Sequence, residues 1–186
     1  MKYLLKKSVK YVFQKLRVFF YTLISDRKVN INRCQPVIAS GAGVFSIHKS
    51  VKFGVKTSPS FYNSYSYIEA RKKSSKIEIG EGTVFNNNAS IIADVGSITI
   101  GNKCIIGTNF HVINSDFHAI NRHESCEIKV SDVKIGDNVF IGNNVSVLKG
   151  VYIPSDSVVA NGSVVTKPIN EKAIIGGNPA KVLKLL

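Results

Sequence analysis

A polar stretch of the chain, residues 114–131, contains the residues best suited to acid–base chemistry. It holds two of the four histidines, and Asp116 stands two positions before His118. An imidazole titrates near neutral pH and can therefore take a proton from a hydroxyl group. A carboxylate bonded to one ring nitrogen would fix the tautomer and leave the other nitrogen as the base. Asp116 and His118 are thus candidate catalytic residues, with Glu124 and Glu127 as rival carboxylates.

This stretch interrupts a repeat in which an aliphatic residue stands at every sixth position. From residue 135 onward the repeat consists of Ile135, Ile141, Val147, Ile153, Val159 and Val165. Earlier sets with the same spacing are Ile79, Phe85 and Ile91, followed by Ile100, Ile106 and Val112. The spacing fits neither a helix nor one long strand, and each unit is too short to bury a core alone. The sequence therefore predicts a solenoid of stacked coils, whose rigid frame would hold the polar stretch as a loop.

The repeat and its interruptions predict the layout of the chain. We expect a helix over 3–25, irregular strands over 29–56, a loop or irregular coil over 57–76, coils over 77–113, a protruding loop at about 114–131, and coils over 132–167. A terminal segment, 168–186, should close the open end of the solenoid, because an uncovered sheet edge invites pairing. Its apolar residues Val182, Leu183, Leu185 and Leu186 are the expected capping surface. In domain terms, 1–28 is a basic amphipathic helix and 29–186 is one all-β domain.

The N-terminal segment, residues 1–28, carries much of the positive charge. It has eight Lys and Arg residues against Asp26 alone, which gives 8 − 1 = +7 of the total net charge of +13. Steps of four and three place Leu5, Val9, Val12, Leu16, Phe19 and Leu23 on one helical stripe. The longest uncharged run, Val18–Ser25, is far shorter than the roughly 20 residues of a membrane span, and we expect no signal peptide. Two interpretations stay open: the stripe packs on protein, or it lies on an anionic membrane.

The bulk composition limits the classes of protein. A chain of 186 residues with 44% hydrophobic content is long enough for one domain with a buried core. Three cysteines without paired spacing favour a reducing, cytoplasmic compartment; Cys104 falls in a small inward position, while Cys34 and Cys126 receive no role. The positive charge is not accompanied by a nucleic-acid-binding motif, so we predict no nucleic-acid partner and keep a nucleic-acid-binding protein as a remote alternative.

Three segments and the repeats together resemble the hexapeptide-repeat acyltransferases. The segments are SDFH (Ser115–His118), GSVVTK (Gly162–Lys167) and GGNPAKV (Gly176–Val182). The resemblance covers about residues 77–186 and is specific to the branch that contains galactoside and maltose acetyltransferases and polysaccharide O-acetyltransferases. It implies a left-handed parallel β-helix of triangular cross-section, assembled as a homotrimer with active sites between subunits. It also implies acetyl-CoA as the donor and no metal.

The resemblance also assigns residues to roles. His118 matches the family's catalytic position, and Asn86 matches an asparagine that bonds the acceptor sugar. The implied coenzyme-binding residues are Asn143, Asn161, Thr166, Lys167, Lys181 and Lys184. The chain departs from the family at Asn161, where a small residue is common, and at 181 and 184, where lysine replaces arginine and bidentate phosphate contacts are lost. A structural interpretation of Asn86 stays open, because Asn86, Asn87 and Asn88 suit tight corners of the coils.

The predicted function is an acetyl-CoA-dependent O-acetyltransferase that modifies a sugar hydroxyl during surface polysaccharide biosynthesis, on a glycan or lipid-linked acceptor. The basic N-terminal segment suggests a peripheral position at the inner membrane face. N-acetylation of an amino sugar nucleotide is the nearest alternative. A remote one is a zinc carbonic anhydrase, which would need His111, His118 and His123 as ligands. His111 directly precedes the inward Val112, so a structural place on a coil is expected for it, and His123 is expected to be an exposed loop residue.

Overall fold

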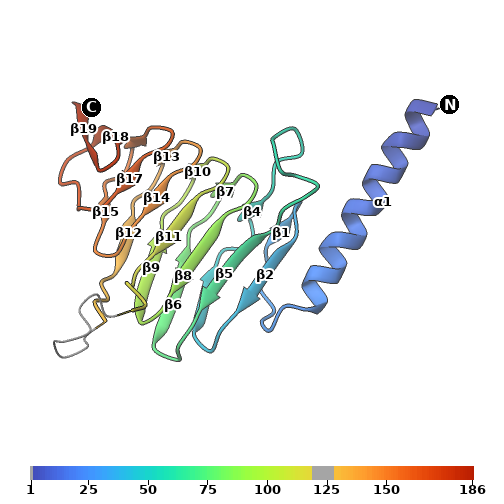
Figure 1. Cartoon of the computed structure of the whole chain (residues 1–186), viewed down its shortest axis with the longest axis horizontal. Coiled ribbons are helices and arrows are strands. Elements are labelled where there is room, and N and C mark those ends of the chain that lie inside the picture. The colour runs from blue at the N-terminus through green and yellow to red at the C-terminus, as the bar shows by residue number, and fades with distance from the viewer. Residues whose placement is uncertain (1, 119–127) are drawn as a thin grey trace.

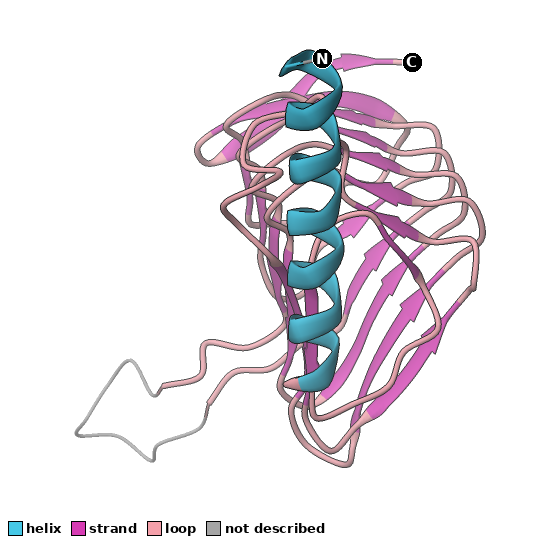
Figure 2. Ribbon diagram, turned by 90° about the vertical axis from the view of Figure 1, so that its right-hand side faces the viewer, coloured by secondary structure: helices cyan, strands magenta, loops and turns pink. Residues whose placement is uncertain are grey.

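One helix lies across the end of a three-sided stack of short strands in the computed structural model, which describes residues 2–118 and 128–186 (Figure 1). The helix, α1, spans Lys2–Leu23, close to the 3–25 predicted from the apolar stripe. The strands form three sheets, and each coil of the chain contributes one strand to each sheet in turn. Figure 2 views the stack from the helix end, with the strands arranged around its long axis, and buried apolar side chains fill the interior. The fold is therefore a parallel β-helix preceded by one helix.

The three sheets are named A, B and C in this article. Sheet A contains β1 (Asn32–Arg33), β4 (Lys52–Phe53), β7 (Val84–Phe85), β10 (Ile105–Ile106), β13 (Phe140–Ile141), β16 (Val158–Val159), β18 (Ala173–Gly177) and β19 (Ala180–Leu185). Sheet B contains β2 (Val37–Ser40), β5 (Ser66–Ala70), β8 (Ser90–Ala93), β11 (His111–Ile113), β14 (Ser146–Val147) and β17 (Val164–Val165). Sheet C contains β3 (Val44–Ile47), β6 (Ser75–Ile79), β9 (Gly96–Ile100), β12 (Val133–Ile135) and β15 (Tyr152–Ile153).

The register of the parallel strands explains the six-residue repeat. Ile106 pairs with Ile141 and Ile141 with Val159, so equivalent residues of successive coils stack directly on one another. The six aliphatic residues from 135 to 165 are all fully buried, at 0% exposure, and Cys104 is buried beside them as predicted. Phe53 and Phe85 extend the same column as stacked rings, 4.5 Å between centroids. Stacking neighbours thus supply the core that no single coil could bury alone.

The coils begin earlier in the chain than the repeat indicates. Residues 66–70 and 75–79, which fall largely in the stretch assigned to a loop or irregular coil, form β5 and β6. Their side chains alternate between buried and partly exposed, the ordinary pattern of a strand. This coil runs through longer strands than the later ones, so its buried residues do not recur at every sixth position. The true excursion in this region is the segment 54–65 between β4 and β5.

The edge between sheets A and B is built from residues with left-handed backbone. Asn88, Asn109 and Asn144 have φ values of 64°, 57° and 56°, and Gly162 continues the column at 70°. Asn88 Nδ2 donates to Asn109 Oδ1 at 2.9 Å, and Asn109 Nδ2 donates to Asn144 Oδ1 at 2.8 Å. Asparagine tolerates this conformation better than other side chains. The asparagines therefore both turn the chain and bond one coil to the next.

The C-terminal segment forms a hairpin that extends sheet A. Strand β18 pairs in parallel with β16, and β19 returns antiparallel to β18, so the segment adds two strands to the end of sheet A, while sheets B and C end at β17 and β15. The apolar residues expected to cap the end nevertheless stay exposed, with Val182, Leu183, Leu185 and Leu186 between 45% and 64% accessible.

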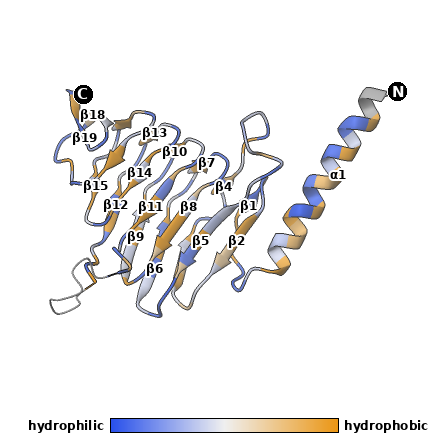
Figure 3. Cartoon of the chain, in the orientation of Figure 1, coloured by the Kyte–Doolittle hydropathy of each residue, from blue (hydrophilic) through white to orange (hydrophobic). Residues whose placement is uncertain are grey.

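Figure 3 shows apolar colour alternating along α1 as well as along the strands. In the described part of the chain, no helix has the length and apolarity needed to cross a membrane.

Candidate active site

The SDFH segment lies at the root of an excursion between β11 and β12, at the edge shared by sheets B and C. Two short segments form the root: Ser115 bridges Val130 in antiparallel fashion, and Asp116 N donates to Lys129 O at 3.1 Å. Buried Asn114 fixes this root to the coil below, because its Oδ1 accepts from Asp94 N at 2.8 Å and its Nδ2 donates to Val95 O at 2.6 Å. The candidate residues are therefore held on a rigid frame although they belong to a loop.

His118 lies just past this root and is exposed in the single chain. Its backbone N donates to Asp116 O at 2.7 Å, which closes a tight turn around Phe117, a residue with φ of 57°. Positive φ is uncommon for a bulky residue, so the surroundings must hold it there. The Arg71 guanidinium lies 4.5 Å from the centre of the Phe117 ring and provides that hold. The turn thus fixes where the His118 backbone leaves the frame.

The carboxylate of Asp116 has a partner that the sequence did not predict. Lys149 Nζ donates to Asp116 Oδ1 at 2.5 Å, and both side chains are largely buried. Asp116 Oδ2 is also buried, and among the described residues it has no hydrogen-bond partner. One carboxylate oxygen therefore anchors the loop, and the other is available to a group that approaches from residue 118 onward.

Further charged residues gather at the same edge from successive coils. Asp94 Oδ2 lies 3.3 Å from Lys72 Nζ and accepts from Ser115 Oγ at 3.4 Å. Arg71 makes a bidentate pair with Glu69, with both N···O distances at 3.1 Å, and this bonding raises the pKa of the guanidinium. No motif marks Arg71, Asp94 or Lys149; only the register of the coils could have brought them together before the structure was known.

His111 takes the structural position expected of it on β11. Its side chain points outward from sheet B, in register with Ser90 and Ser146 of the neighbouring coils. Burial lowers the pKa of the imidazole, which favours the neutral ring. Within residues 2–118 and 128–186, no three His, Cys, Asp or Glu side chains converge as metal ligands, and His123, Glu124, Cys126 and Glu127 lie outside these ranges.

The predicted acceptor residue, Asn86, lies at the edge between sheets A and B. Its Nδ2 donates to Ser58 Oγ at 3.0 Å and its Oδ1 accepts from Asn87 N at 2.9 Å, so it contacts the excursion 54–65. Sheet B separates this edge from the edge that carries His118. One chain therefore does not bring Asn86 and His118 together.

The predicted coenzyme residues are distributed over both edges and the hairpin. Asn143 and Asn161 lie on the Asn86 edge, where their Oδ1 atoms accept from Thr108 N at 2.8 Å and from Asn143 N at 2.6 Å. Thr166 and Lys167 follow β17 on the His118 edge; because Val147 pairs with Val165, Lys167 falls one coil above Lys149. Lys181 and Lys184 are exposed on β19. The two asparagines thus have a structural task in addition to any contact with a ligand.

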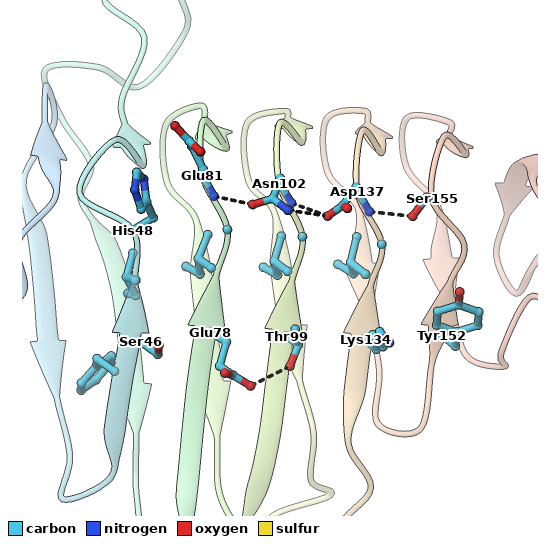
Figure 4. Close-up of a pocket in the computed structure, with 18 residues that line it drawn as sticks. Ser46, His48, Glu78, Glu81, Thr99, Asn102, Lys134, Asp137, Tyr152 and Ser155 are labelled. Atoms are coloured by element: carbon cyan, nitrogen blue, oxygen red, sulfur yellow. Dashed lines mark hydrogen bonds between the residues drawn. The ribbon is translucent and has the colours of Figure 1, made fainter.

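A groove of about 910 Å³ runs over the outer face of sheet C (Figure 4). Along its rim Glu81 N donates to Asn102 Oδ1 at 2.8 Å, Asn102 N to Asp137 Oδ1 at 2.7 Å, and Asp137 N to Ser155 Oγ at 2.9 Å. The side chains of Asn102, Asp137 and Ser155 each reach across to the backbone of the preceding coil, so these bonds form a ladder from coil to coil, while the Glu81 side chain points away from it (Figure 4). None of the predicted site residues lines this groove, so we assign it no part in the candidate site.

The comparisons with known proteins show which family the chain resembles. Residues 132–167 match the family model described as bacterial transferase hexapeptide (six repeats). Together with the parallel β-helix and the relatives below, this match confirms that the chain resembles the hexapeptide-repeat acyltransferases.

Particular relatives are sugar-modifying enzymes by name. The chain is 37% identical over 114 residues to the polysialic acid O-acetyltransferase of Escherichia coli, covering 60% of this chain and 37% of that one. It is 32% identical over 112 residues to the galactoside O-acetyltransferase of Escherichia coli, covering 59% and 54%. It spans between 37% and 60% of the length of the first four curated relatives it matches.

Solved structures agree on the fold. The polysialic acid O-acetyltransferase OatWY superposes with a TM-score of 0.66 at 28% identity, over 81% of this chain and 68% of that one. A galactoside acetyltransferase in complex with coenzyme A gives a TM-score of 0.53 at 21% identity, over 98% and 79% of the two chains, and shows the shared fold alone.

Proposed function

We propose that the protein is an acetyl-CoA-dependent O-acetyltransferase that modifies a sugar hydroxyl in surface polysaccharide biosynthesis, of capsule or O-antigen. The observation that carries the proposal is the position of His118, at the root of an excursion held rigidly by Asn114 and by the Asp116–Lys149 pair. The names of the relatives support the same reaction, since two of them are sugar O-acetyltransferases. A cytoplasmic location at the inner membrane face is proposed with it.

In the proposed mechanism His118 accepts the proton of the acceptor hydroxyl. The hydroxyl oxygen attacks the thioester carbonyl, so that a C–O bond forms and the C–S bond then breaks. The proton on the imidazole passes to the leaving sulfur, which departs as the free thiol of coenzyme A. Asp116 Oδ2, buried and without a described partner, is the proposed acceptor for the other ring N–H of His118.

The proposed assembly is a homotrimer of left-handed β-helices with the active site between subunits. Asn86 and His118 lie at opposite edges of sheet B, so a site that uses both needs two copies of the chain. The outer face of sheet A offers a surface for such contact. An apolar ridge runs along it in register, consisting of Val84, Ile105, Phe140, Val158 and Ile174. Ile105 and Phe140 are 58% and 49% exposed in the single chain. A continuous row of exposed apolar side chains marks a surface that contacts another molecule.

The donor is proposed to lie along the coils that carry Asn143 and Asn161. Lys167, Lys181 and Lys184 are the proposed contacts to its phosphates, since exposed ammonium groups attract phosphate as point charges. Thr166 is proposed to contact the pantetheine arm. When bound, acetyl-CoA supplies the activated acyl group.

The test is release of free thiol from acetyl-CoA in the presence of glycan acceptors. We expect acceptor-dependent release, and a fall of about 10²- to 10⁴-fold in kcat for His118→Ala, because a general base contributes about that much. His48→Ala is the matched control: His48 is exposed, and among the described residues its imidazole bonds only the nearby Ser50. Equal activity of His118→Ala and wild type would refute the mechanism. Amino sugar nucleotides in the acceptor panel, read by product mass, separate O- from N-acetylation.

A further inference from the structure

Helix α1 contacts the β-helix through polar groups rather than through its apolar stripe. Gln14 Nε2 donates to Cys34 O at 2.8 Å. Arg17 donates to Phe61 O at 3.1 Å and to Ser64 O at 2.7 Å, and the Tyr21 ring lies 5.1 Å from that of Tyr65. Successive residues turn by about 100° around a helix, so Gln14, Arg17 and Tyr21 occupy one side. That side faces the first coil and the excursion 54–65.

The apolar stripe of α1 lies on the opposite side and is exposed. Leu5, Val9, Val12, Leu16, Phe19 and Leu23 are between 53% and 65% accessible, and Phe13, Phe20 and Ile24 widen the surface. We call these nine residues the α1 stripe. A contiguous apolar surface of this width on one chain marks a contact with another molecule or a membrane. The structure therefore rejects packing of the stripe on the chain's own β-helix.

The charges of α1 distinguish between the remaining partners. The helix carries Lys2, Lys6, Lys7, Lys10, Lys15 and Arg17 and has no acidic residue. On the side of α1 that faces the β-helix, a cavity of about 340 Å³ is lined by Lys10 and Lys15 of the helix, by Arg33 and Lys56 of the coils, and by no carboxylate. The neighbouring coils therefore add positive charge there and do not neutralise the helix. Stripe-to-stripe packing with a second copy would bring like charges together with nothing in either helix to offset them. An anionic lipid surface matches the stripe and the charge at once.

We propose that α1 lies flat on an anionic lipid bilayer, with its stripe at the boundary between headgroups and acyl chains. The lysines beside the stripe contact the headgroups, each contributing on the order of 1 kcal/mol. Figures 1 and 2 show α1 across the first-coil end of the β-helix. The β-helix would then stand on the membrane with the C-terminal hairpin farthest from it.

This orientation agrees with the proposed trimer. Only the combined binding of three helices depends on that trimer, whereas the contact between α1 and the bilayer does not. Three copies with parallel axes would carry their helices on the same base, so all three stripes would reach one membrane. Simultaneous binding of linked sites raises the overall affinity well above that of one site. The same base-down arrangement would hold the enzyme beside a lipid-linked acceptor.

Co-sedimentation of the full chain with vesicles tests the proposal. We expect binding to phosphatidylcholine vesicles that contain phosphatidylglycerol. Binding to phosphatidylcholine alone, or to the mixed vesicles in high salt, should be weaker by a factor of about ten or more. Leu16→Glu with Phe19→Glu should reduce binding by about tenfold or more, because it places two charges in the stripe. Leu186→Glu is the matched control, an exposed leucine at the other end of the molecule, and should bind as wild type does.

Tryptophan fluorescence can report whether the stripe enters the bilayer, because the chain has no tryptophan and a single introduced one gives the whole signal. The emission of Phe19→Trp should shift to the blue when anionic vesicles are added, while Tyr152→Trp on sheet C should show no shift. Thiol release with a soluble glycan, measured without vesicles, reports the proposed reaction separately. Equal vesicle binding by wild type and the Leu16/Phe19 double variant would overturn the proposal. The proposal would also be overturned if the double variant changed its oligomeric state but bound vesicles as wild type does.

Discussion

Lys149 Nζ lies 2.5 Å from Asp116 Oδ1, which joins the root of the candidate catalytic loop to the coil above it. The two residues are 33 positions apart in the chain, yet the stacked coils bring them to the same edge. The pair is 22% to 29% exposed, so solvent screening limits its value to about 1 kcal/mol or less. Its importance is therefore positional: it holds one oxygen of Asp116 against the coil above, while the other has no partner among the described residues.

Substitutions at Asp116 and Lys149 separate an orienting role from an anchoring role. If Asp116 Oδ2 orients the imidazole, Asp116→Asn should lower kcat by about 10- to 100-fold and alter the pH profile of kcat, while Lys149→Met should have a smaller effect. If the pair only anchors the loop, both variants should lower activity equally and the double variant should be no worse than either. Steady-state kinetics of the four proteins distinguish these outcomes, with the mutational cycle as the internal control.

The buried side chain of Asn87 bonds three backbone groups of the excursion 54–65. Its Nδ2 donates to Pro59 O at 2.7 Å and to Val55 O at 3.0 Å, and its Oδ1 accepts from Val55 N at 3.1 Å. Asn87→Ala leaves these backbone groups without partners, so we expect a loss of about 1–3 kcal/mol in the free energy of unfolding.

Chemical denaturation measures this loss, and two neighbours serve as controls. Asn88→Gly keeps the left-handed backbone that Asn88 adopts and should be nearly neutral. Asn86→Ala removes two hydrogen bonds of a half-buried side chain, so it should cost less stability than Asn87→Ala, and it should raise the KM for the acceptor if Asn86 is the proposed sugar contact. Equal stability of Asn87→Ala and wild type would show that the excursion is held in another way.

The core of the later coils was predictable because stacking imposes a strict spacing. Ile135 and Val165 are buried as the six-residue repeat requires. The first coils were less evident, since Ile68 and Ile77 belong to longer strands that break the spacing. Stacked contacts between the early coils, such as Phe53 on Phe85, depend on coil lengths that no local pattern specifies.

The candidate site was predictable only in part, for a related reason. The SDFH motif marks His118 and Asp116, but Lys149 and Arg71 carry no signature and reach the site through register alone. The stripe of α1 was evident from its periodicity. The exposure of the stripe was not evident from the sequence. The side of α1 that contacts the β-helix is determined by hydrogen bonds of Gln14 and Arg17, and no sequence pattern marks these two polar residues.

The apolar ridge on sheet A is the surface on which the proposed trimer can be tested. Ile105→Glu with Phe140→Glu places charges at the centre of the ridge and should dissociate the proposed trimer, since a buried charge without a partner is costly. Light scattering measures the mass, and circular dichroism checks that the β-helix persists. Tyr152→Glu, an exposed aromatic on the outer face of sheet C, is the control. Dissociation by Tyr152→Glu, with an intact oligomer in the ridge variant, would place the interface on sheet C instead.

His111 predicts a specific loss of stability in mild acid. Its burial on sheet B lowers the pKa of the imidazole below the ordinary value of about 6.5. As the pH falls, the unfolded chain therefore binds a proton at this histidine before the folded chain does. The free energy of unfolding is unaffected above about pH 6.5 and decreases as the pH drops from there toward the lowered pKa of His111 in the folded chain. His111→Gln removes this proton linkage while keeping a polar side chain between Ser90 and Ser146. Urea unfolding of the two proteins across this window should show a shallower pH dependence in the variant. His48→Gln, at an exposed position, should retain the wild-type slope, and an unchanged slope in His111→Gln would contradict the assignment of the acid sensitivity to this residue.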